Sequence, residues 1–381
     1  MNFQQLGVNF KIVDTLKKTG IEEATDIQVR TIPQILKNRD IIACSKTGTG
    51  KTLAYLLPML TMLDPEIKGI QFLILAPTQE LCSQINNNIR TLLDQADLRN
   101  ESALLVGDGN ISRQIESLKR KPAFAVGTSA RVMQLIKMKK IHLNNVKVFC
   151  LDEADEMLSK TQMENVINIR HSLMRRTQTL LFSASIQKRT IKDASAITND
   201  PVIINLVAED KSGQAIPNTI KHFYFSCNRN EKIETLRKVV KALDCDRVMV
   251  FVNSKYEYQE TCQKLKYHHY EIASIAGNET KQEKIAAIDN FKTGKVKILI
   301  STDLAARGLQ IDAIDAVIHL NLPSENEIYI HRAGRCGRNG KQGLSISLVT
   351  ENEAEKIKKL RKSLGINMLE KKLYNGKIVS K

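Results

Sequence analysis

The chain has 381 residues, of which 42% are hydrophobic and 26% are charged. This composition excludes a disordered chain, and the length favours two globular domains. The net charge of +16 indicates an acidic macromolecule as the binding partner. Both parts of the chain share this charge, because residues 1–208 hold 27 basic and 20 acidic residues and residues 209–381 hold 30 and 21. No run of Lys or Arg forms a tail, so we expect the basic residues to be spread over folded surfaces.

The cysteines and the N-terminus indicate the compartment. Seven cysteines without closely spaced pairs argue against a zinc site or a disulfide framework and favour a reducing environment. The N-terminus has no signal-peptide pattern, and no apolar stretch is long enough to span a bilayer. We therefore expect a cytoplasmic protein that does not enter a membrane.

The first predicted element is a helix in residues 9–20, and the next feature is a phosphate-binding loop. An apolar run at 41–44 precedes a glycine-containing loop, and an apolar helical pattern follows it. Glycines let backbone N–H groups converge on an anion, and the helix points its positive end at the same place. Lys51 is expected to reach the β and γ phosphates, and the Thr52 hydroxyl to hold Mg²⁺. The loop residues expected to bind nucleotide are Ser45, Lys46, Thr47, Gly48, Thr49 and Gly50, with Ser45 standing where the usual pattern has Gly.

Strand-length apolar runs then alternate with helical stretches along most of the chain, which predicts βαβ units on parallel sheets. The alternation breaks at a polar segment with Gly and Pro, so we place a linker at 208–217, between a first domain at 1–207 and a second at 218–365. The residues after 350 are Lys-rich and predicted to be helical to about 364, with a short C-terminal extension at 366–381. The predicted strands are 41–44, 72–76, 103–106, 123–126, 146–151, 179–182 and 202–206, then 220–225, 248–252, 272–275, 296–300, 316–320 and 344–349.

Polar clusters follow these strands in both domains, and the carboxyl ends of parallel strands are where open sheets bind ligands. The buried strand at 146–151 runs into Asp152, Glu153 and Asp155. Adjacent acids at a strand end are costly unless a cation is near, and Mg²⁺ on a bound nucleotide is such a cation. Asp152 is expected to hold the metal, directly or through water, and Glu153 to polarise the attacking water. A solvated helix N-terminus, where acids are also favourable, is the alternative.

Together with the phosphate loop, the sequence Asp152-Glu153-Ala154-Asp155 resembles the DEAD-box family of ATP-dependent RNA helicases, and the resemblance extends from residue 3 to about 349. It implies two tandem RecA-like domains, ATP and Mg²⁺ as cofactors, RNA as partner, and ATP hydrolase activity. Residues 20–28 resemble the family's Q motif. The resemblance implies that Gln28 reads the adenine edge and that Phe3 packs on the base.

Further motifs of the family follow in its order. Residues 77–81, 107–109 and 128–131 resemble three segments that contact the RNA backbone, and 183–185 resembles the motif that links nucleotide and RNA sites. In the second half, 251–253, 301–308 and 331–338 resemble motifs IV, V and VI. The implied RNA-binding residues are Pro77, Thr78, Gln79, Gly107, Thr128, Arg131, Thr302 and Arg307; the implied coupling residues are Ser183, Ser185, Asp155 and His331.

Motif VI contains three arginines and a histidine interrupted by two glycines, which is unusual for a structural helix because glycine and like charges both destabilise helices. A γ-phosphate opposite them offsets both costs. Arg335 and Arg338 are therefore the expected arginine fingers. In motif V, Gln310 stands where the family has an Asp that binds the nucleotide ribose.

Because the phosphate loop and the fingers lie on different domains, we expect hydrolysis to require domain closure, which ATP and RNA would both favour. The leading hypothesis is an RNA-dependent ATPase that locally unwinds or remodels short RNA duplexes or RNA–protein complexes, acting as a monomer with unidentified protein partners. An ATP-gated RNA clamp with little turnover is the alternative. We find no substrate site for a kinase and no guanine-reading motif for a GTPase. Charge alone also permits DNA.

Several positions depart from the family. Gln79 replaces an Arg, Ser129 and Ala130 replace Pro and Gly, and Ser185 replaces a Thr. These changes predict weaker or differently selective RNA contacts in the first domain, while the hydrolytic residues are intact.

The Gln79→Arg variant tests this prediction. The change restores a cation that can pair with an RNA phosphate, so we expect higher RNA affinity in a binding titration at low salt. An affinity equal to that of the unchanged chain would count against the prediction.

Overall fold

The structure, a computed structural model, describes residues 1–46, 48–98, 101–107, 109–184, 188–209, 216, 219–276, 279–306, 314–337 and 341–380. The chain divides into two compact units, Met1–Val207 and Ala208–Lys381. Within the described residues, no helix combines the length and apolar character needed to cross a membrane. Most of the predicted linker lies outside the described residues.

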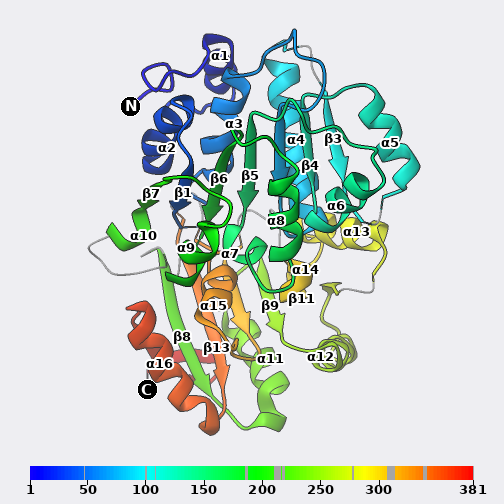
Figure 1. The fold of residues 1–381 in the computed structure, drawn as a ribbon. Helices are drawn as coiled ribbons and strands as arrows, with labels where there is room; N and C mark the ends of the chain where they lie inside the picture. The colour runs from blue at the N-terminus through cyan, green and yellow to red at the C-terminus, as the bar shows by residue number, and fades with distance from the viewer. Residues whose placement is uncertain are drawn as a thin grey trace. The chain divides into compact units, whose positions relative to one another are not determined.

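The first unit is built on a seven-stranded sheet in the order β3-β4-β2-β5-β6-β1-β7, and all of its strand pairs are parallel (Figure 1). The inner strands are buried along their whole length because helices cover both faces. Its strands are β1 (Ile41–Cys44), β2 (Phe72–Leu75), β3 (Ser102–Leu105), β4 (Phe124–Gly127), β5 (Val148–Asp152), β6 (Gln178–Ser183) and β7 (Val202–Asn205).

The helices of the first unit form two layers. Side chains of α1 to α4 pack into one hydrophobic cluster against the sheet, and those of α6 to α9 pack into a second cluster on the opposite face. The helices are α1 (Phe10–Lys18), α2 (Asp26–Leu36), α3 (Lys51–Thr61), α4 (Gln79–Gln95), α5 (Ile111–Lys119), α6 (Ser129–Lys137), α7 (Ala154–Met157), α8 (Met163–His171), α9 (Lys188–Ala194) and α10 (Leu206–Glu209).

The second unit contains an eight-stranded sheet in the order β10-β11-β9-β12-β13-β8-β14-β15. All pairs are parallel except the antiparallel hairpin of β14 and β15. The strands are β8 (Ile220–Ser226), β9 (Val248–Val252), β10 (Ile272–Ile275), β11 (Ile298–Thr302), β12 (Ala316–His319), β13 (Gly343–Val349), β14 (Met368–Tyr374) and β15 (Lys377–Ser380). The helices are α11 (Lys232–Ala242), α12 (Lys255–Tyr267), α13 (Lys281–Lys292), α14 (Asp303–Ala306), α15 (Asn326–Ala333) and α16 (Ala354–Leu364).

The predicted α/β class with two parallel sheets is confirmed, and each predicted strand overlaps an observed one. The C-terminal hairpin was not predicted. β14 pairs with β8 through Met368, Leu369 and Glu370, so the residues assigned to an extension add strands to the second sheet. The missed signal was Asn375-Gly376, a two-residue turn with positive φ at both positions, between strand-length segments.

Candidate active site

The phosphate loop lies between β1 and α3, as the sequence predicts. Gly48 and Gly50 have φ values of 77° and 87°, in the left-handed region that disfavours side chains. A Cβ atom on Gly50 would lie 2.4 Å from Nε2 of Gln28. Glycine is therefore required at position 50 by backbone conformation and by the close approach of α2. Thr47 lies outside the described residues.

Lys51 is the first residue of α3, directly after this loop, and its side chain bonds back to the loop. Its Nζ donates hydrogen bonds to the carbonyl oxygens of Ser45, at 2.7 Å, and Lys46, at 2.9 Å. Burial lowers the pKa of Lys51, and the negative charge of Asp152 is the largest opposing influence. The ammonium group is thus stabilised by carbonyl dipoles and a nearby carboxylate.

The side chain of Asp152 is fixed at the end of β5. The residue is 5% exposed, its Oδ2 accepts a hydrogen bond from the Tyr55 hydroxyl at 2.9 Å, and its Oδ1 accepts one from the Glu153 N–H at 2.9 Å. Burial raises the pKa of Asp152, while the bond from Tyr55 and the charge of Lys51 oppose this. The carboxylate is therefore oriented by two donors.

Tyr55 connects the two residues predicted to hold the metal. Its hydroxyl bonds to the side chain of Thr52 as well as to Asp152. Tyr55 is fully buried in α3, one turn after Lys51. The sequence analysis missed Tyr55, although a tyrosine among the apolar residues of this helix is a signal that its hydroxyl needs a partner.

The order of strands brings three motifs together. β6 lies between β1 and β5, with Ser183 opposite Cys44 and Phe182 opposite Asp152. The N–H of Ser45 also bonds to the Ser183 carbonyl at 3.2 Å. Ser183 therefore lies between the phosphate loop and Asp152, and its coupling role stays a prediction.

Two neighbours complete this end of the sheet. Glu153 is the N-cap residue of α7 and has a φ of 50°, a sparsely populated conformation for a residue with a side chain. Asp155 follows in α7, and its charge acts on the pKa of Lys51. Ser185 lies outside the described residues.

Gln28 and Phe3 are both buried, at 2% and 1% exposure. The Oε1 of Gln28 accepts a hydrogen bond from the Thr25 N–H at 2.9 Å, and its Nε2 donates to the Gly50 carbonyl at 3.0 Å. The Thr25 hydroxyl bonds to the Thr49 carbonyl at 2.7 Å, so the start of α2 is tied to the phosphate loop at two points. Phe3 belongs to the core of the first unit. Their contacts with adenine stay predictions.

The predicted RNA-binding residues of the first unit gather at the ends of β2, β3 and β4, which are neighbours in the sheet. Arg131 donates to the carbonyls of Gly107, at 2.5 Å, and Gly109, at 3.2 Å, and it is 9% exposed. Its guanidinium group therefore shapes the loop between β3 and α5. Pro77 and Thr78 lead into α4, and Gln79 and Thr128 lie beside the same loop.

In the second unit, Arg332 ties motifs IV, V and VI together. This side chain is 1% exposed, and it donates to Asp303 at 2.5 and 2.6 Å, to Oδ1 of Asn253 at 2.7 Å and to the Asn321 carbonyl at 2.9 Å. Its guanidinium group also lies 5.1 Å from the centre of the Phe251 ring. Burying this charge is tolerated because nearly every donor has an acceptor. The sequence analysis had assigned Arg332 no role.

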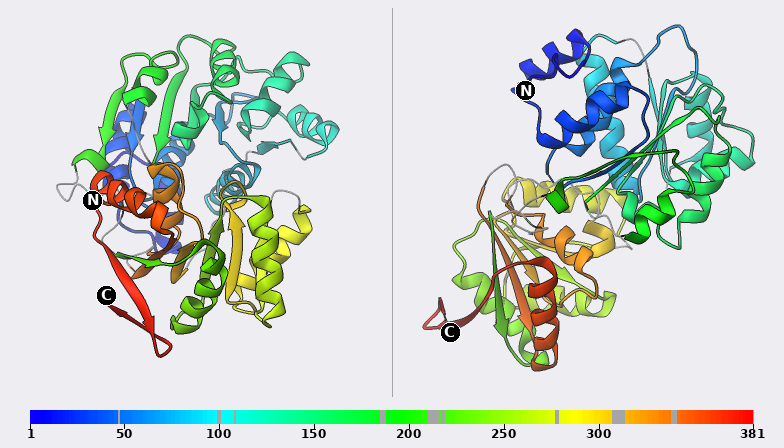
Figure 2. Two further views of the ribbon diagram at one scale, coloured as in Figure 1. Left: turned by 90° about the horizontal axis from the view of Figure 1, so that it is seen from below. Right: turned by 60° about the vertical axis from the view of Figure 1, so that its left-hand side comes forward.

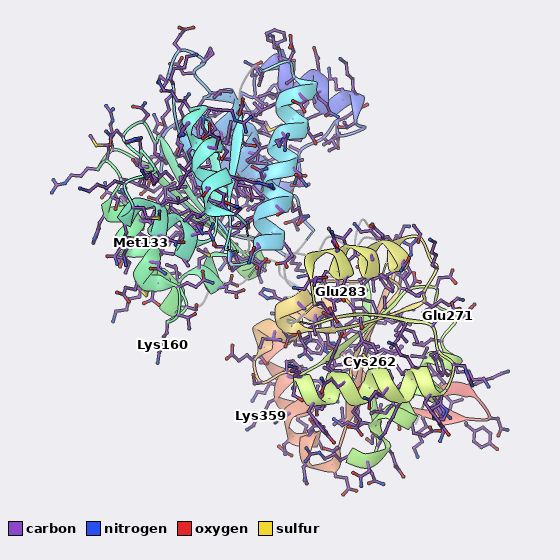
Figure 3. The ribbon with its side chains drawn as sticks, turned by 90° about the vertical axis from the view of Figure 1, so that its right-hand side faces the viewer. Met133, Lys160, Cys262, Glu271, Glu283 and Lys359 are labelled. Carbon is purple, nitrogen blue, oxygen red and sulfur yellow. The ribbon has the colours of Figure 1, made fainter. Side chains whose placement is uncertain are left out.

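Thr302 and Arg335 occupy opposite ends of the second sheet. Thr302 ends β11 and lines a hollow of about 450 Å³ with Lys255 of α12 and Glu283 of α13, which is labelled in Figure 3. Arg335 follows α15 and precedes β13, and its neighbour Cys336 bridges Ile314 just before β12. Motif VI therefore reaches both ends of the sheet, because Arg332 contacts residues that follow β9, β11 and β12, whereas Arg335 lies near the start of β12.

The physical reason is that a crossover helix returns the chain to the amino ends of the strands before the next strand begins. His331 lies in the last turn of α15. Arg307, Gln310 and Arg338 lie outside the described residues.

Comparison with known proteins follows this geometry. Residues 25–194 match the family model described as DEAD/DEAH box helicase, and residues 231–340 match the helicase conserved C-terminal domain. DEAD-box ATP-dependent RNA helicase CshC of Bacillus cereus is 38% identical over 364 residues, which cover 95% of this chain and 91% of that protein. The chain belongs to the DEAD-box family of ATP-dependent RNA helicases.

Other relatives of this DEAD-box protein agree. CshA of Bacillus subtilis is 32% identical over 363 residues, covering 95% of this chain and 72% of that protein. Among solved structures, S. cerevisiae Dbp5 bound to RNA and ADP BeF3 has a TM-score of 0.87 and 30% identity, covering 97% of this chain and 95% of that chain. Mss116p bound to ssRNA and AMP-PNP also has a TM-score of 0.87, with 25% identity, covering 98% and 79%.

The Arg332→Lys variant tests the role of the buried guanidinium. Lysine keeps the charge but cannot reach all the acceptors, so it leaves buried oxygens unpaired and is expected to destabilise the second unit by about 3 to 5 kcal/mol. Urea unfolding of the full chain followed by circular dichroism measures this.

Arg361→Lys is the matched control, because Arg361 is exposed on α16. It is expected to change stability by less than about 0.5 kcal/mol. Equal unfolding curves for the two variants would contradict the role assigned to Arg332.

Proposed function

We propose that this DEAD-box protein is an RNA-dependent ATPase that locally unwinds or remodels short RNA duplexes or RNA–protein complexes by ATP-driven closure of its two domains. The observation that carries the proposal is the linked set of Thr52, Tyr55 and Asp152 beside Lys51, because it presents phosphate-binding and metal-binding groups at one end of one sheet. Glu153 adjoins this set.

The residues present suit ATP with Mg²⁺. Mg²⁺ in ATPases is held by one or two protein oxygens together with substrate phosphates, and the Asp152 carboxylate and Thr52 hydroxyl are such oxygens. When bound, the ion neutralises charge on the phosphates. The phosphate loop and Lys51 orient the triphosphate, Gln28 and Phe3 bind the adenine, and Gln310 contacts the ribose.

Glu153 is proposed as the catalytic carboxylate. It accepts a hydrogen bond from the attacking water and takes up its proton as the phosphoryl group is transferred. Arg335 and Arg338 supply positive charge to the transferred group from the second domain. Hydrolysis therefore depends on closure, which is the basis for coupling to RNA.

The RNA site is proposed to comprise the ends of β2, β3 and β4 together with Thr302 and Arg307. In support, the structural neighbours Dbp5 and Mss116p are bound to RNA and to nucleotide analogues. Ser183, Ser185, Asp155 and His331 are proposed to couple the two ligands. Cytoplasmic location and a monomeric state remain expectations from the sequence.

Glu153→Gln tests the proposal. The amide cannot accept the proton from water, so ATP hydrolysis should fall by at least about 100-fold while ATP-dependent RNA binding persists. The measurement is phosphate release with and without single-stranded RNA at low salt, with RNA retention measured alongside.

Glu164→Gln on the exposed side of α8 is the control and should retain RNA-stimulated hydrolysis. If the unchanged chain binds RNA in an ATP-dependent way but hydrolyses no ATP, the protein is the alternative ATP-gated clamp. Hydrolysis that RNA does not stimulate would overturn the proposal.

Tyr55→Phe tests the orientation of Asp152. The bond from Tyr55 lowers the pKa of Asp152, so its loss raises that pKa further and favours the protonated acid, which binds metal poorly. We expect half-maximal hydrolysis to require roughly 10-fold more Mg²⁺. Because protonation increases as pH falls, the deficit should be larger at pH 6 than at pH 8.

Tyr267→Phe serves as the control, because Tyr267 is 80% exposed. A Mg²⁺ requirement for Tyr55→Phe that equals that of the control at both pH values would show that Tyr55 does not support the metal site.

A further inference from the structure

Basic residues are concentrated at the C-terminal end of the chain. Residues 354–381 contain nine Lys and Arg residues and two Glu residues, which gives +7 of the +9 carried by residues 209–381. Apolar residues separate many of these basic residues, so the concentration does not appear in the sequence as a long run of Lys or Arg.

The fold gathers much of this charge on one side of the second sheet. Ile357, Leu360 and Leu364 of α16 pack into the same core cluster as Met368 of β14. The exposed side chains of α16 face away from that core and include Lys356, Lys358, Lys359, Arg361 and Lys362. Figure 3 shows Lys359 at the outer surface of the second unit.

The hairpin of β14 and β15 extends the basic side of the second sheet. Alternate residues of a strand point to the same face, so Lys372 and Tyr374 share the face of Met368. On β15, Val379 lies opposite Lys372, and Lys377 lies opposite Tyr374. In both views of Figure 2 the hairpin, in red, projects from the rest of its unit.

Lys371 belongs to the other face. Its Nζ lies 5.1 Å from the centre of the Phe223 ring and donates to the Ser380 hydroxyl at 2.8 Å. The surface that concerns us consists of Lys356, Lys359, Lys362, Lys372, Tyr374 and Lys377, and we name it the C-terminal basic surface.

This surface includes a hollow that suits a phosphate group. The hollow, of about 310 Å³, is lined by Lys356 and Lys359 of α16 and by Ser324, Glu325 and Asn326 at the start of α15. Asn326 donates to the Ser363 hydroxyl at 3.0 Å, which fixes the two helices together. Two ammonium groups outweigh the single Glu325 carboxylate, and the α15 N–H groups add positive potential.

The C-terminal basic surface lies apart from the proposed RNA contact at Thr302. β14 is five strand positions from β11 in the sheet, a separation of about 24 Å at roughly 4.8 Å per strand. An RNA strand that contacts both Thr302 and the C-terminal basic surface must extend past Thr302 by roughly the length of seven stacked nucleotides.

We propose that the C-terminal basic surface binds the sugar-phosphate backbone of RNA that flanks the strand held by the helicase core. The lysines pair with phosphates, and Tyr374, which is 68% exposed, offers its ring to an unpaired base. This inference rests on one part of the proposed function, RNA binding by the core, because the core must hold RNA for a flanking segment to exist. The surface anchors the remainder of the substrate while the core acts on a short part of it.

The test is a variant of the full chain that combines Lys359→Gln, Lys362→Gln, Lys372→Gln and Lys377→Gln. Its affinity is measured for single-stranded RNAs of about 10 and about 30 nucleotides at several salt concentrations. For the long RNA we expect affinity to fall about 10- to 100-fold and the slope of log affinity against log salt to become shallower by up to about 2.8, or 0.7 per contact. Short-RNA affinity and ATP hydrolysis at saturating short RNA should be unchanged.

The matched control combines Lys264→Gln, Lys266→Gln, Lys292→Gln and Lys295→Gln, which removes the same charge from exposed residues elsewhere in the second unit. An equal loss in the control would show a general effect of net charge and overturn the proposal. Unchanged long-RNA affinity, or an equal loss for both RNA lengths, would overturn it too. An unchanged unfolding midpoint checks that the fold is intact.

Tyr374 is tested separately. Tyr374→Ala should weaken binding of the long RNA, and Tyr374→Phe should retain it, because stacking needs the ring and not the hydroxyl. If hydrolysis proves independent of RNA while long-RNA binding still depends on these lysines, the proposed function fails and this inference stands.

Discussion

Asp152 brings a carboxylate into the interior of the first unit, at the end of a strand with sheet neighbours on both sides. A buried charge is stable only when surrounding groups replace the water that it has lost. Tyr55, the Glu153 N–H and the nearby Lys51 do so here. Lys51 and Tyr55 belong to α3, and Glu153 lies between β5 and α7. The positions of the phosphate loop, α3 and α7 are thereby tied to one another through a single side chain.

The second unit is under the same constraint, but its buried charge is positive. Arg332 is buried, and its acceptors come from the ends of β9, β11 and β12. Neither unit could keep its charge if these loops moved apart, so the buried charge makes the spacing of the motifs part of the stability of each unit. Motif residues that never touch a ligand can therefore be as necessary as those that do.

Much of the fold could be predicted from the sequence because buried parallel strands appear as continuous apolar runs, as at 72–76 and 248–252. The phosphate loop and Asp152 could be predicted because their chemistry needs particular residues at particular spacing. Tyr55 and Arg332 could not be assigned in this way, since their roles depend on partners about 100 and 30 residues away, or more, which only the strand order brings close. The local sequence pattern gives no information about partners so distant in the chain.

The hairpin β14–β15 was missed for a different reason. Its strands lie at one edge of the second sheet, so few of their side chains are buried and the apolar pattern is weak. The turn at Asn375-Gly376 was the stronger signal. Where packing contributes little, turn chemistry predicts structure better than hydrophobicity does.

The bond between the Gln28 amide and the Gly50 carbonyl has a consequence for how the protein tells nucleotides apart. If adenine takes the same amide as its partner, the base competes with the phosphate loop for one donor. A base that cannot pair with glutamine leaves the loop attached to α2. The identity of the base would then alter the backbone of the loop that holds the phosphates. The protein would therefore discriminate between nucleotides through the geometry of their phosphate groups as well as through affinity.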